Sequence, residues 1–276
     1  MSKRGITLYM HVHQPYRVRD YTVFDTSIDH NYFTDPDPLS NQNNEKILKK
    51  VADKSYRPMN ALLEKLLLAN PEFKVSLSIS GTFIDQAQAW APDVIESFQR
   101  LVNTGQVEIV AETYYHSLAF FFSRSEFERQ VEAHKAKIRE VFGVETNVFR
   151  NTELAYNDSL AQWADNYGFK GILAEGWDPI LDWRSPNYVY QPEGTQNIAL
   201  LLKNYKLSDD LAFRFSNRAW EEWPLTVDKY NSWMESAIND QPLVNLFMDY
   251  ETFGEHQWQD TGIFEFFEEF VTRWLS

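Results

Sequence analysis

Two segments place carboxylates directly after apolar, strand-like runs. Asp249 and Glu251 follow the apolar residues 243–248, and Glu153 closely follows the strand-like stretch 146–150. Most carboxylates in proteins are solvated surface charges or helix caps. A carboxylate at the C-terminal end of a strand is a stronger candidate for chemistry, because barrel enzymes place their catalytic groups there. The two segments therefore predict an acid/base pair, drawn from strands far apart in the sequence.

The elements that would position this pair are short β-rich runs alternating with longer helical patterns. Such alternation predicts parallel strands joined by right-handed crossovers. No glycine-rich phosphate loop follows the first run, whereas reactive side chains follow most of the runs, which favours a closed α/β barrel over an open sheet. The expected strands are Ile6–Val12, Phe73–Ser80, Val107–Ala111, Thr146–Arg150, Lys170–Ala174, Ile198–Lys203 and Leu243–Asp249.

Two helices and two long connections are also predicted. Apolar residues at helical spacing over 59–67 indicate a helix that Asn70-Pro71 ends. A second helix begins near Ser123 or at the capping-box pattern 125–128 and ends at Gly143. His134 falls on its apolar stripe, where we expect a core histidine. The connections 16–44 and 178–197 are long enough to be functional loops over the barrel mouth.

Composition limits the classes of partner. The formal net charge of -14 would repel phosphate groups and anionic lipid, so we expect no nucleic acid, no membrane surface and an uncharged substrate. No stretch has the apolar length of a membrane span. Cysteine is absent, which permits a reducing compartment, and we expect a cytoplasmic protein. The many aromatic rings could stack on flat ligand faces.

Four blocks, in order along nearly the whole chain, resemble the sequence regions of glycoside hydrolase family 57. They are His11-Val12-His13-Gln14-Pro15, the segment 105–116, Phe149-Arg150-Asn151-Thr152-Glu153 and the segment 248–256. The resemblance implies a (β/α)7 barrel and a retaining glycoside hydrolase or transglycosylase that acts on α-1,4-glucans or maltooligosaccharides. It implies that Glu153 is the nucleophile and Asp249 the general acid/base. Whether water or a sugar accepts the glycosyl group, as in an α-amylase or a 4-α-glucanotransferase, stays open.

Further residues are expected to bind substrate around this pair. We expect only one of His11 and His13 to face the barrel mouth, and the resemblance nominates His13. Trp177 directly follows a strand and is the best candidate for a sugar platform among Trp177, Trp183, Trp220 and Trp223. The expected substrate-binding residues are His13, Gln14, Arg150, Glu112, His116, Trp177, Glu251 and His256.

Metal is the main alternative source of chemistry. His13, His116, Asp249 and His256 offer ligands that could imitate a zinc site, but no His-x-x-x-His or comparable cluster is present, so we expect neither metal nor another cofactor. Two other classes stay open. One is a metal-dependent sugar-processing barrel related to deacetylases or α-mannosidases, and the other is a catalytically silent glucan-binding protein.

The family has a fifth region in a helical section beyond the barrel, and this chain stops at Ser276. The resemblance therefore implies one catalytic barrel domain over residues 1–276 without that section. Residues 263–275 predict a helix with an apolar stripe. Either its rings pack on the barrel, or some face a missing section, in which case the chain would self-associate through this helix.

Overall fold

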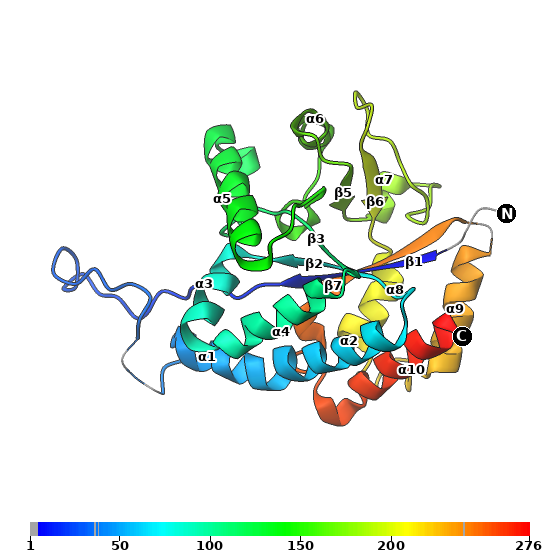
Figure 1. The fold of residues 1–276 in the computed structure, drawn as a ribbon, viewed down its shortest axis with the longest axis horizontal. Coiled ribbons are helices and arrows are strands. Elements are labelled where there is room, and N and C mark those ends of the chain that lie inside the picture. The colour runs from blue at the N-terminus through cyan, green and yellow to red at the C-terminus, as the bar shows by residue number, and fades with distance from the viewer. Residues whose placement is uncertain (1–4, 36, 38, 240) are drawn as a thin grey trace.

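The computed structural model describes residues 5–276 except 36, 38 and 240. Along these residues the chain forms seven strands, whose strand-to-strand pairing is parallel throughout (Figure 1). Each predicted strand is confirmed, with ends that differ by at most two residues. The strands are β1 (Gly5–Val12), β2 (Val75–Ile79), β3 (Val107–Ile109), β4 (Val148–Arg150), β5 (Gly171–Ala174), β6 (Ala199–Leu202) and β7 (Leu243–Asp249).

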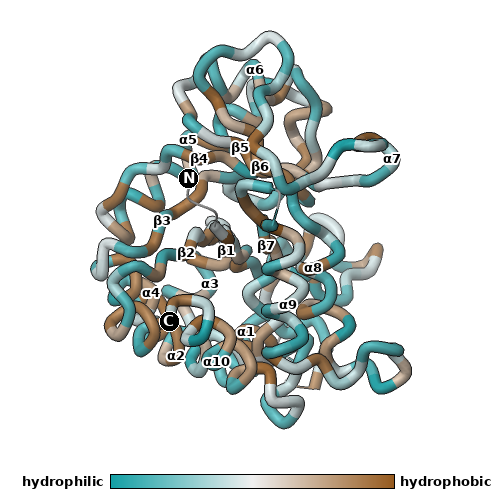
Figure 2. The backbone as a smooth tube through the Cα atoms, turned by 90° about the vertical axis from the view of Figure 1, so that its right-hand side faces the viewer, coloured by the Kyte–Doolittle hydropathy of each residue, from teal (hydrophilic) through white to brown (hydrophobic). Residues whose placement is uncertain are grey.

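The strands follow one another in chain order around a ring, which Figure 2 shows in a view along the strands. Hydrogen bonds join them in two continuous runs, β3-β2-β1-β7 and β4-β5-β6. A parallel bridge between Ala111 and Phe149 connects the β3 side to β4. The N–H of Asn204 donates to the Asn245 carbonyl at 2.9 Å and connects the β6 side to β7. The fold is therefore a (β/α)7 barrel, distorted where these two junctions carry few bonds.

Helices cover the outside of the ring, with α2, α4 and α10 below the sheet and α5 and α6 above it in Figure 1. The α-helices are α1 (Asn44–Val51), α2 (Arg57–Ala69), α3 (Gly81–Trp90), α4 (Pro92–Asn103), α5 (Arg124–Phe142), α6 (Asp158–Tyr167), α7 (Asp178–Leu181), α8 (Tyr205–Asp209), α9 (Val227–Ile238) and α10 (Ile263–Leu275). Short π-helical turns are η1 (Ala52–Tyr56) and η4 (Asp210–Arg214), and 3-10 turns are η2 (Ala119–Phe121), η3 (Thr152–Leu154), η5 (Tyr250–Thr252) and η6 (Gln259–Thr261).

The helix ends follow the sequence signals with one correction. Helix α2 ends at the cap residue Asn70, as predicted. Helix α5 begins after Ser123, whose hydroxyl accepts the N–H of Glu126, so the predicted capping box at 125–128 is wrong and lies inside the first turn. Gly143 ends this helix in the left-handed conformation. His134 is fully buried and its Nε2 lies 2.9 Å from the Ile79 carbonyl, which confirms a core histidine.

Side chains alternate along the strands between the barrel interior and the helix layer. On β1, Leu8, Met10 and Val12 join the large core beneath the helices, whereas Tyr9 faces inward. The Tyr9 ring meets the Phe247 ring edge-on at 5.4 Å inside the barrel. The interior is thus filled by apolar side chains near its middle, and polar side chains occupy the ends of the same inward-facing rows. The interior cluster comprises Tyr9, Val110, Leu154, Leu173 and Phe247.

Helix α10 packs its apolar stripe onto α2 and α9. Ile263, Phe266, Phe267 and Phe270 are buried, while Trp274 is partly buried against the same core. None of the exposed large apolar side chains of the described residues lies on this helix. Self-association through α10 would therefore have to use its partly buried residues, and it stays a prediction.

The connection 16–44 projects away from the barrel as the blue loop in Figure 1 and carries exposed apolar residues such as Phe24 and Ile28. The connection 178–197 contains α7 and a bridge from Tyr190 to Leu200 on β6. No helix among the described residues combines the length and apolarity that crossing a membrane requires.

Candidate active site

A cavity of about 170 Å³ lies at the C-terminal end of the barrel. Both Glu153 and Asp249 line it, although they lie 96 positions apart in the sequence. Barrel closure brings them together, because β4 and β7 end at the same rim. Its lining residues are Tyr9, His11, Arg150, Glu153, Leu154, Glu175, Lys203, Ala212, Phe213, Phe247, Met248, Asp249, Thr252 and His256.

Glu153 sits in a strained turn just beyond β4. Its φ and ψ of 56° and 25° are left-handed, and Leu154 follows with a φ of 54°. Such backbone conformations cost non-glycine residues about 1–3 kcal/mol and persist where surrounding structure enforces them. The Glu153 side chain is 74% exposed, and its Oε1 lies 3.1 Å from His116 Nε2. The turn therefore presents a solvent-accessible carboxylate to the cavity and fixes one of its oxygens.

Asp249 is the last residue of β7, and its side chain is 54% exposed. Its Oδ1 lies 3.8 Å from His11 Nδ1. Burial acts to raise the pKa of Asp249, but hydrogen bonding and charge from His11, with Arg150 and His256, outweigh it and hold the pKa below its usual range. A substrate that displaces water here would change this balance by removing solvent from the carboxylate.

A buried carboxylate links the two exposed ones. Glu112 Oε2 lies 3.1 Å from His11 Nε2 and 3.3 Å from His116 Nδ1. His11 and His116 in turn approach Asp249 and Glu153, so a His-Glu-His bridge runs between the candidate acid/base and the candidate nucleophile. Glu112 is fully buried and is not among the residues lining the cavity, which makes it a positioning group rather than a substrate contact.

Arg150 completes this network. Its Nη1 lies 3.8 Å from Glu112 Oε2 and 3.3 Å from His116 Nδ1. Burial acts to raise the pKa of Glu112, but His11, His116 and Arg150 hold it well below the usual range. Burial and Arg150 act to lower the pKa of His11, while Glu112 and Asp249 outweigh them and raise it. Glu112 therefore stays ionised and His11 tends to keep its proton.

We expect Glu112→Gln to lower the free energy of unfolding by about 3–5 kcal/mol, because the change leaves the buried Arg150 without its carboxylate. The stabilisation from a carboxylate of depressed pKa is present above the ordinary glutamate pKa and is lost as the pH falls through the folded value. Urea unfolding followed from pH 7 down to pH 3 should therefore show that the difference in unfolding free energy between the parent and Glu112→Gln is constant above the ordinary glutamate pKa and shrinks below it. Glu108→Gln, on the exposed face of β3, is the control and should match the parent.

The expectation that only one of His11 and His13 faces the mouth is wrong. Residues two apart on a strand share a face, and the two rings stack with centroids 5.6 Å apart. His13 Nδ1 lies 2.7 Å from the Ser80 hydroxyl, and the His13 ring centroid is 4.3 Å from that of His116. Burial, with His116 and His11, lowers the pKa of His13 to about 3, so this ring is neutral. His11, rather than His13, lines the cavity between the carboxylates.

Two other predicted substrate contacts, Glu251 and Gln14, are buried and share one hydrogen-bond partner, Tyr56. The Tyr56 hydroxyl donates to Glu251 Oε1, and Gln14 Nε2 donates to the Tyr56 hydroxyl at 3.3 Å. Burial and the neighbouring Asp249 carboxylate raise the pKa of Glu251 to about 7. Neither Glu251 nor Gln14 lines the cavity, and the geometry supports a role in fixing the segment after β7.

Three side chains that can serve as metal ligands come together in a way that the sequence spacing did not reveal. Ligand atoms of His11, Glu112 and His116 lie within 4.8 Å of one another. The prediction that the chain has no cluster of metal-ligating side chains is therefore wrong, because His11, Glu112 and His116 form one. The donor set fits a cation poorly, because Arg150 already places a positive charge against Glu112 and His116.

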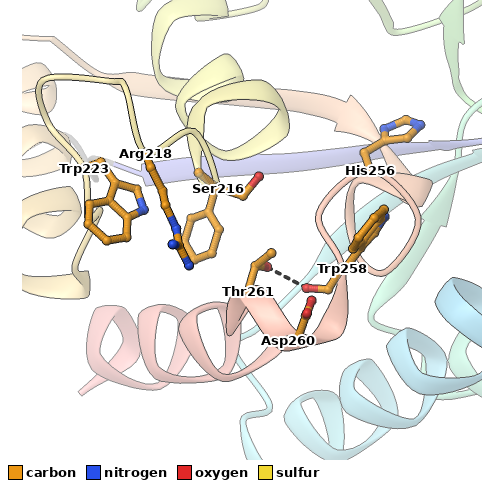
Figure 3. Close-up of a pocket in the computed structure, with 8 residues that line it drawn as sticks. Ser216, Arg218, Trp223, His256, Trp258, Asp260 and Thr261 are labelled. Carbon is orange, nitrogen blue, oxygen red and sulfur yellow. Dashed lines mark hydrogen bonds between the residues drawn. The ribbon is translucent and has the colours of Figure 1, made fainter.

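Two larger cavities flank the central one. On the Glu153 side, a cavity of about 710 Å³ shares Glu153, Leu154 and Glu175 with it and includes Trp177, the predicted sugar platform. On the other side, a cavity of about 560 Å³ shares His256 with it (Figure 3). The connection 178–197 supplies part of the first of these, as expected for a functional loop.

Sequence reasoning left some lining residues unassigned. Lys203 follows β6, and its Nζ lies 3.2 Å from Asp209 and 3.8 Å from Glu175. Both Lys203 and Glu175 could have been found from their positions at strand ends. Phe213, 64% exposed in η4, carries no such signal. Among the other candidate platforms, Trp220 packs on the core beside Trp233, whereas Trp183 is 86% exposed and lines none of these three cavities.

A parallel barrel with two carboxylates at one mouth cavity is the architecture of an enzyme that uses paired carboxylates. Residues 7–275 match the sequence model of glycosyl hydrolase family 57. The chain is 45% identical, over 95% of its own length, to a Methanocaldococcus jannaschii protein named "Putative alpha-amylase" and spans 54% of that protein. The chain belongs to glycosyl hydrolase family 57.

Solved structures show the same fold. The 4-α-glucanotransferase of Thermococcus litoralis superposes with a TM-score of 0.72 at 20% identity, covering all of this chain and 38% of that one. A "putative polysaccharide deacetylase" of Mycobacterium smegmatis superposes with a TM-score of 0.63 at 13% identity, covering all of this chain and 85% of that one. The chain thus spans about half of the Methanocaldococcus jannaschii protein and less than half of the Thermococcus litoralis enzyme.

Proposed function

We propose that this chain carries the catalytic site of a retaining glycoside hydrolase or transglycosylase that acts on α-1,4-glucans or maltooligosaccharides. The observation that carries the proposal is the shared cavity of Glu153 and Asp249, which come from β4 and β7 and meet at one barrel mouth. Family membership and the names of the relatives, an α-amylase and a 4-α-glucanotransferase, support the substrate class.

In the first step, the Glu153 carboxylate attacks the anomeric carbon while Asp249 protonates the departing glycosidic oxygen. In the second step, Asp249 removes a proton from water or from a sugar hydroxyl, and that oxygen displaces Glu153 from the anomeric carbon. His116 and Arg150 keep Glu153 oriented and near positive charge. The net charge of -14 and the absence of cysteine support an uncharged substrate and a cytoplasmic setting.

Incubation with maltoheptaose tests this function. Products should be maltooligosaccharides, and nuclear magnetic resonance at early times should show the α-anomer of the newly formed reducing end. Products longer than seven units would show transfer to sugar. Initial release of the β-anomer would contradict a retaining mechanism, and binding without turnover would favour the silent glucan-binding class.

The second candidate is a metal-dependent sugar-processing barrel, favoured by the cluster of His11, Glu112 and His116 and by the shared fold with the deacetylase. We expect prolonged dialysis against EDTA to leave maltoheptaose turnover within about twofold of the untreated protein, because Arg150 already compensates Glu112. Loss of activity on chelation and its return on addition of zinc would move the protein to the metal-dependent class.

A further inference from the structure

The cavity of about 560 Å³ beside the catalytic one is built by two chain segments at the barrel mouth. One segment lies between η4 and α9 and contributes Ser216, Arg218 and Trp223, and the other follows β7 and contributes His256, Trp258 and Asp260. Figure 3 shows Trp223 at one end and His256 with Trp258 at the other. Pockets of roughly 300–1,000 Å³ commonly hold small ligands, so there is room for more than one hexose ring.

The two indoles are exposed without being loose. Trp223 and Trp258 are 42% and 60% exposed, so a ligand in the cavity could reach both rings. The indole N–H of Trp258 donates to the Glu255 carbonyl at 3.1 Å, and the Lys54 ammonium lies 5.6 Å from its ring centroid. The Arg218 guanidinium lies 5.7 Å from the Trp223 centroid. The rings are therefore held as platforms before any ligand arrives.

The turn that carries His256 and Trp258 is also fixed. Gly254 has a φ of 106°, and a Cβ there would come within 1.8 Å of the Lys54 carbonyl, so only glycine fits this approach. The Gly254 N–H donates to the Gln257 carbonyl at 2.8 Å, and the His256 N–H donates to the Glu251 carbonyl at 2.9 Å. Such rigidity favours binding, because little conformational freedom is lost when a ligand is held.

The polar side chains between the two indoles are suited to a ligand that carries hydroxyl groups and no net charge. Arg218 and Asp260 carry opposite charges, and neither makes an ion pair with another described residue. A guanidinium can donate to sugar oxygens and a carboxylate can accept from sugar hydroxyls. With an aromatic platform at each end, the cavity matches an uncharged, hydroxyl-rich ligand with flat apolar faces.

His256 relates this cavity to the reaction. It lines both cavities, and its charge acts on the Asp249 carboxylate. The general acid/base is the group at which the leaving sugar departs and the acceptor enters. We propose that the cavity between Trp223 and Trp258 is an acceptor subsite, which binds hexose rings of an incoming glucan chain and sets the ratio of transfer to hydrolysis. The assignment rests on the proposed function.

The transfer step is balanced with the groups already described. A hydroxyl of the bound acceptor gives its proton to the Asp249 carboxylate as its oxygen bonds to the anomeric carbon. The ester bond between that carbon and Glu153 breaks, and Glu153 leaves as a carboxylate. A sugar held between Trp223 and Trp258 raises the local concentration of this hydroxyl relative to water, which favours transfer.

The test uses α-maltosyl fluoride as donor and maltose as acceptor, with fluoride release and longer oligosaccharides measured separately. We expect Trp223→Ala and Trp258→Ala each to raise the maltose concentration for half-maximal transfer by about tenfold. The change in transfer should exceed any change in fluoride release without acceptor. Trp183→Ala, an exposed tryptophan outside the three cavities, is the matched control and should give the parent curve. Parent-like acceptor curves for both variants would overturn the assignment.

A failure of the proposed function would look different, because the parent chain would then release no fluoride. Calorimetric titration with maltotriose in the Glu153→Gln background then decides the subsite by itself. Weaker binding by about tenfold on adding Trp223→Ala supports it, and unchanged binding overturns it. Circular dichroism identifies a variant that fails to fold, and Trp258→Phe, which keeps an aromatic ring, then replaces Trp258→Ala and should retain most of the acceptor affinity.

Discussion

Glu153→Gln is expected to lower turnover of maltoheptaose by about 10⁴-fold or more, because an amide cannot form the glycosyl ester. The glutamine preserves side-chain length, and the left-handed backbone at this position is already enforced by its surroundings. Folding and oligosaccharide binding should therefore change little. Turnover is measured from reducing ends released, and binding from calorimetry on the same preparation.

The matched control for this change is Glu72→Gln, an exposed glutamate between α2 and β2. It should retain parent activity, which excludes a general effect of losing one negative charge. A Glu153→Gln protein with activity near that of the parent would show that Glu153 is not the nucleophile. Attention would then move to Glu175, which lines the same cavity.

Asp249→Asn is expected to lose about 10²–10⁴-fold on maltoheptaose but much less on an α-glycosyl fluoride. Fluoride departs without a proton, so the acid is dispensable in the first step. Because the pKa of Asp249 is held low in the free protein, kcat/KM for maltoheptaose should fall with rising pH at acidic values. That limb should be absent for the fluoride donor. Measuring both substrates across pH separates proton donation from substrate binding.

Azide provides a further check on Asp249→Asn. It should enter from the face that the leaving group vacates and give an α-glycosyl azide, since the small anion needs no general base. Asp20→Asn, an exposed aspartate in the 16–44 connection, is the control and should form no azide adduct. Equal losses of Asp249→Asn on both substrates would mean that Asp249 is structural and would turn suspicion to Glu251, whose pKa is about 7.

The strands and the two carboxylates were accessible from sequence because their signals are local. Each strand is a short apolar run, and β-strand ends at a barrel mouth are where reactive side chains gather. Glu153 and Asp249 follow from that rule together with the family resemblance. The inward orientation of His11 could also have been predicted from strand alternation. His11 lies two residues after Tyr9 on the same strand, and Tyr9 faces the barrel interior.

The remaining features depend on tertiary contacts that no local pattern encodes. Glu112 reads as one more strand-end carboxylate, and only packing shows that it is buried between two histidines and Arg150. The cavity at Trp223 and Trp258 is lined by one segment that precedes β7 in the sequence and one that follows it. These two segments meet only because the barrel closes, so no local sequence pattern predicts that they line one cavity.

The left-handed backbone at Glu153 implies a trade-off between durability and activity. A glycine at position 153 would adopt the same backbone conformation without steric cost. The proposed nucleophile therefore occupies a position where glycine would make the folded chain more stable. Selection for thermal stability alone would favour Glu153→Gly, and this substitution would remove the carboxylate on which the proposed activity depends. Engineering that aims to harden the chain should therefore leave residues 153–154 untouched and seek its gains on the helices that surround the barrel.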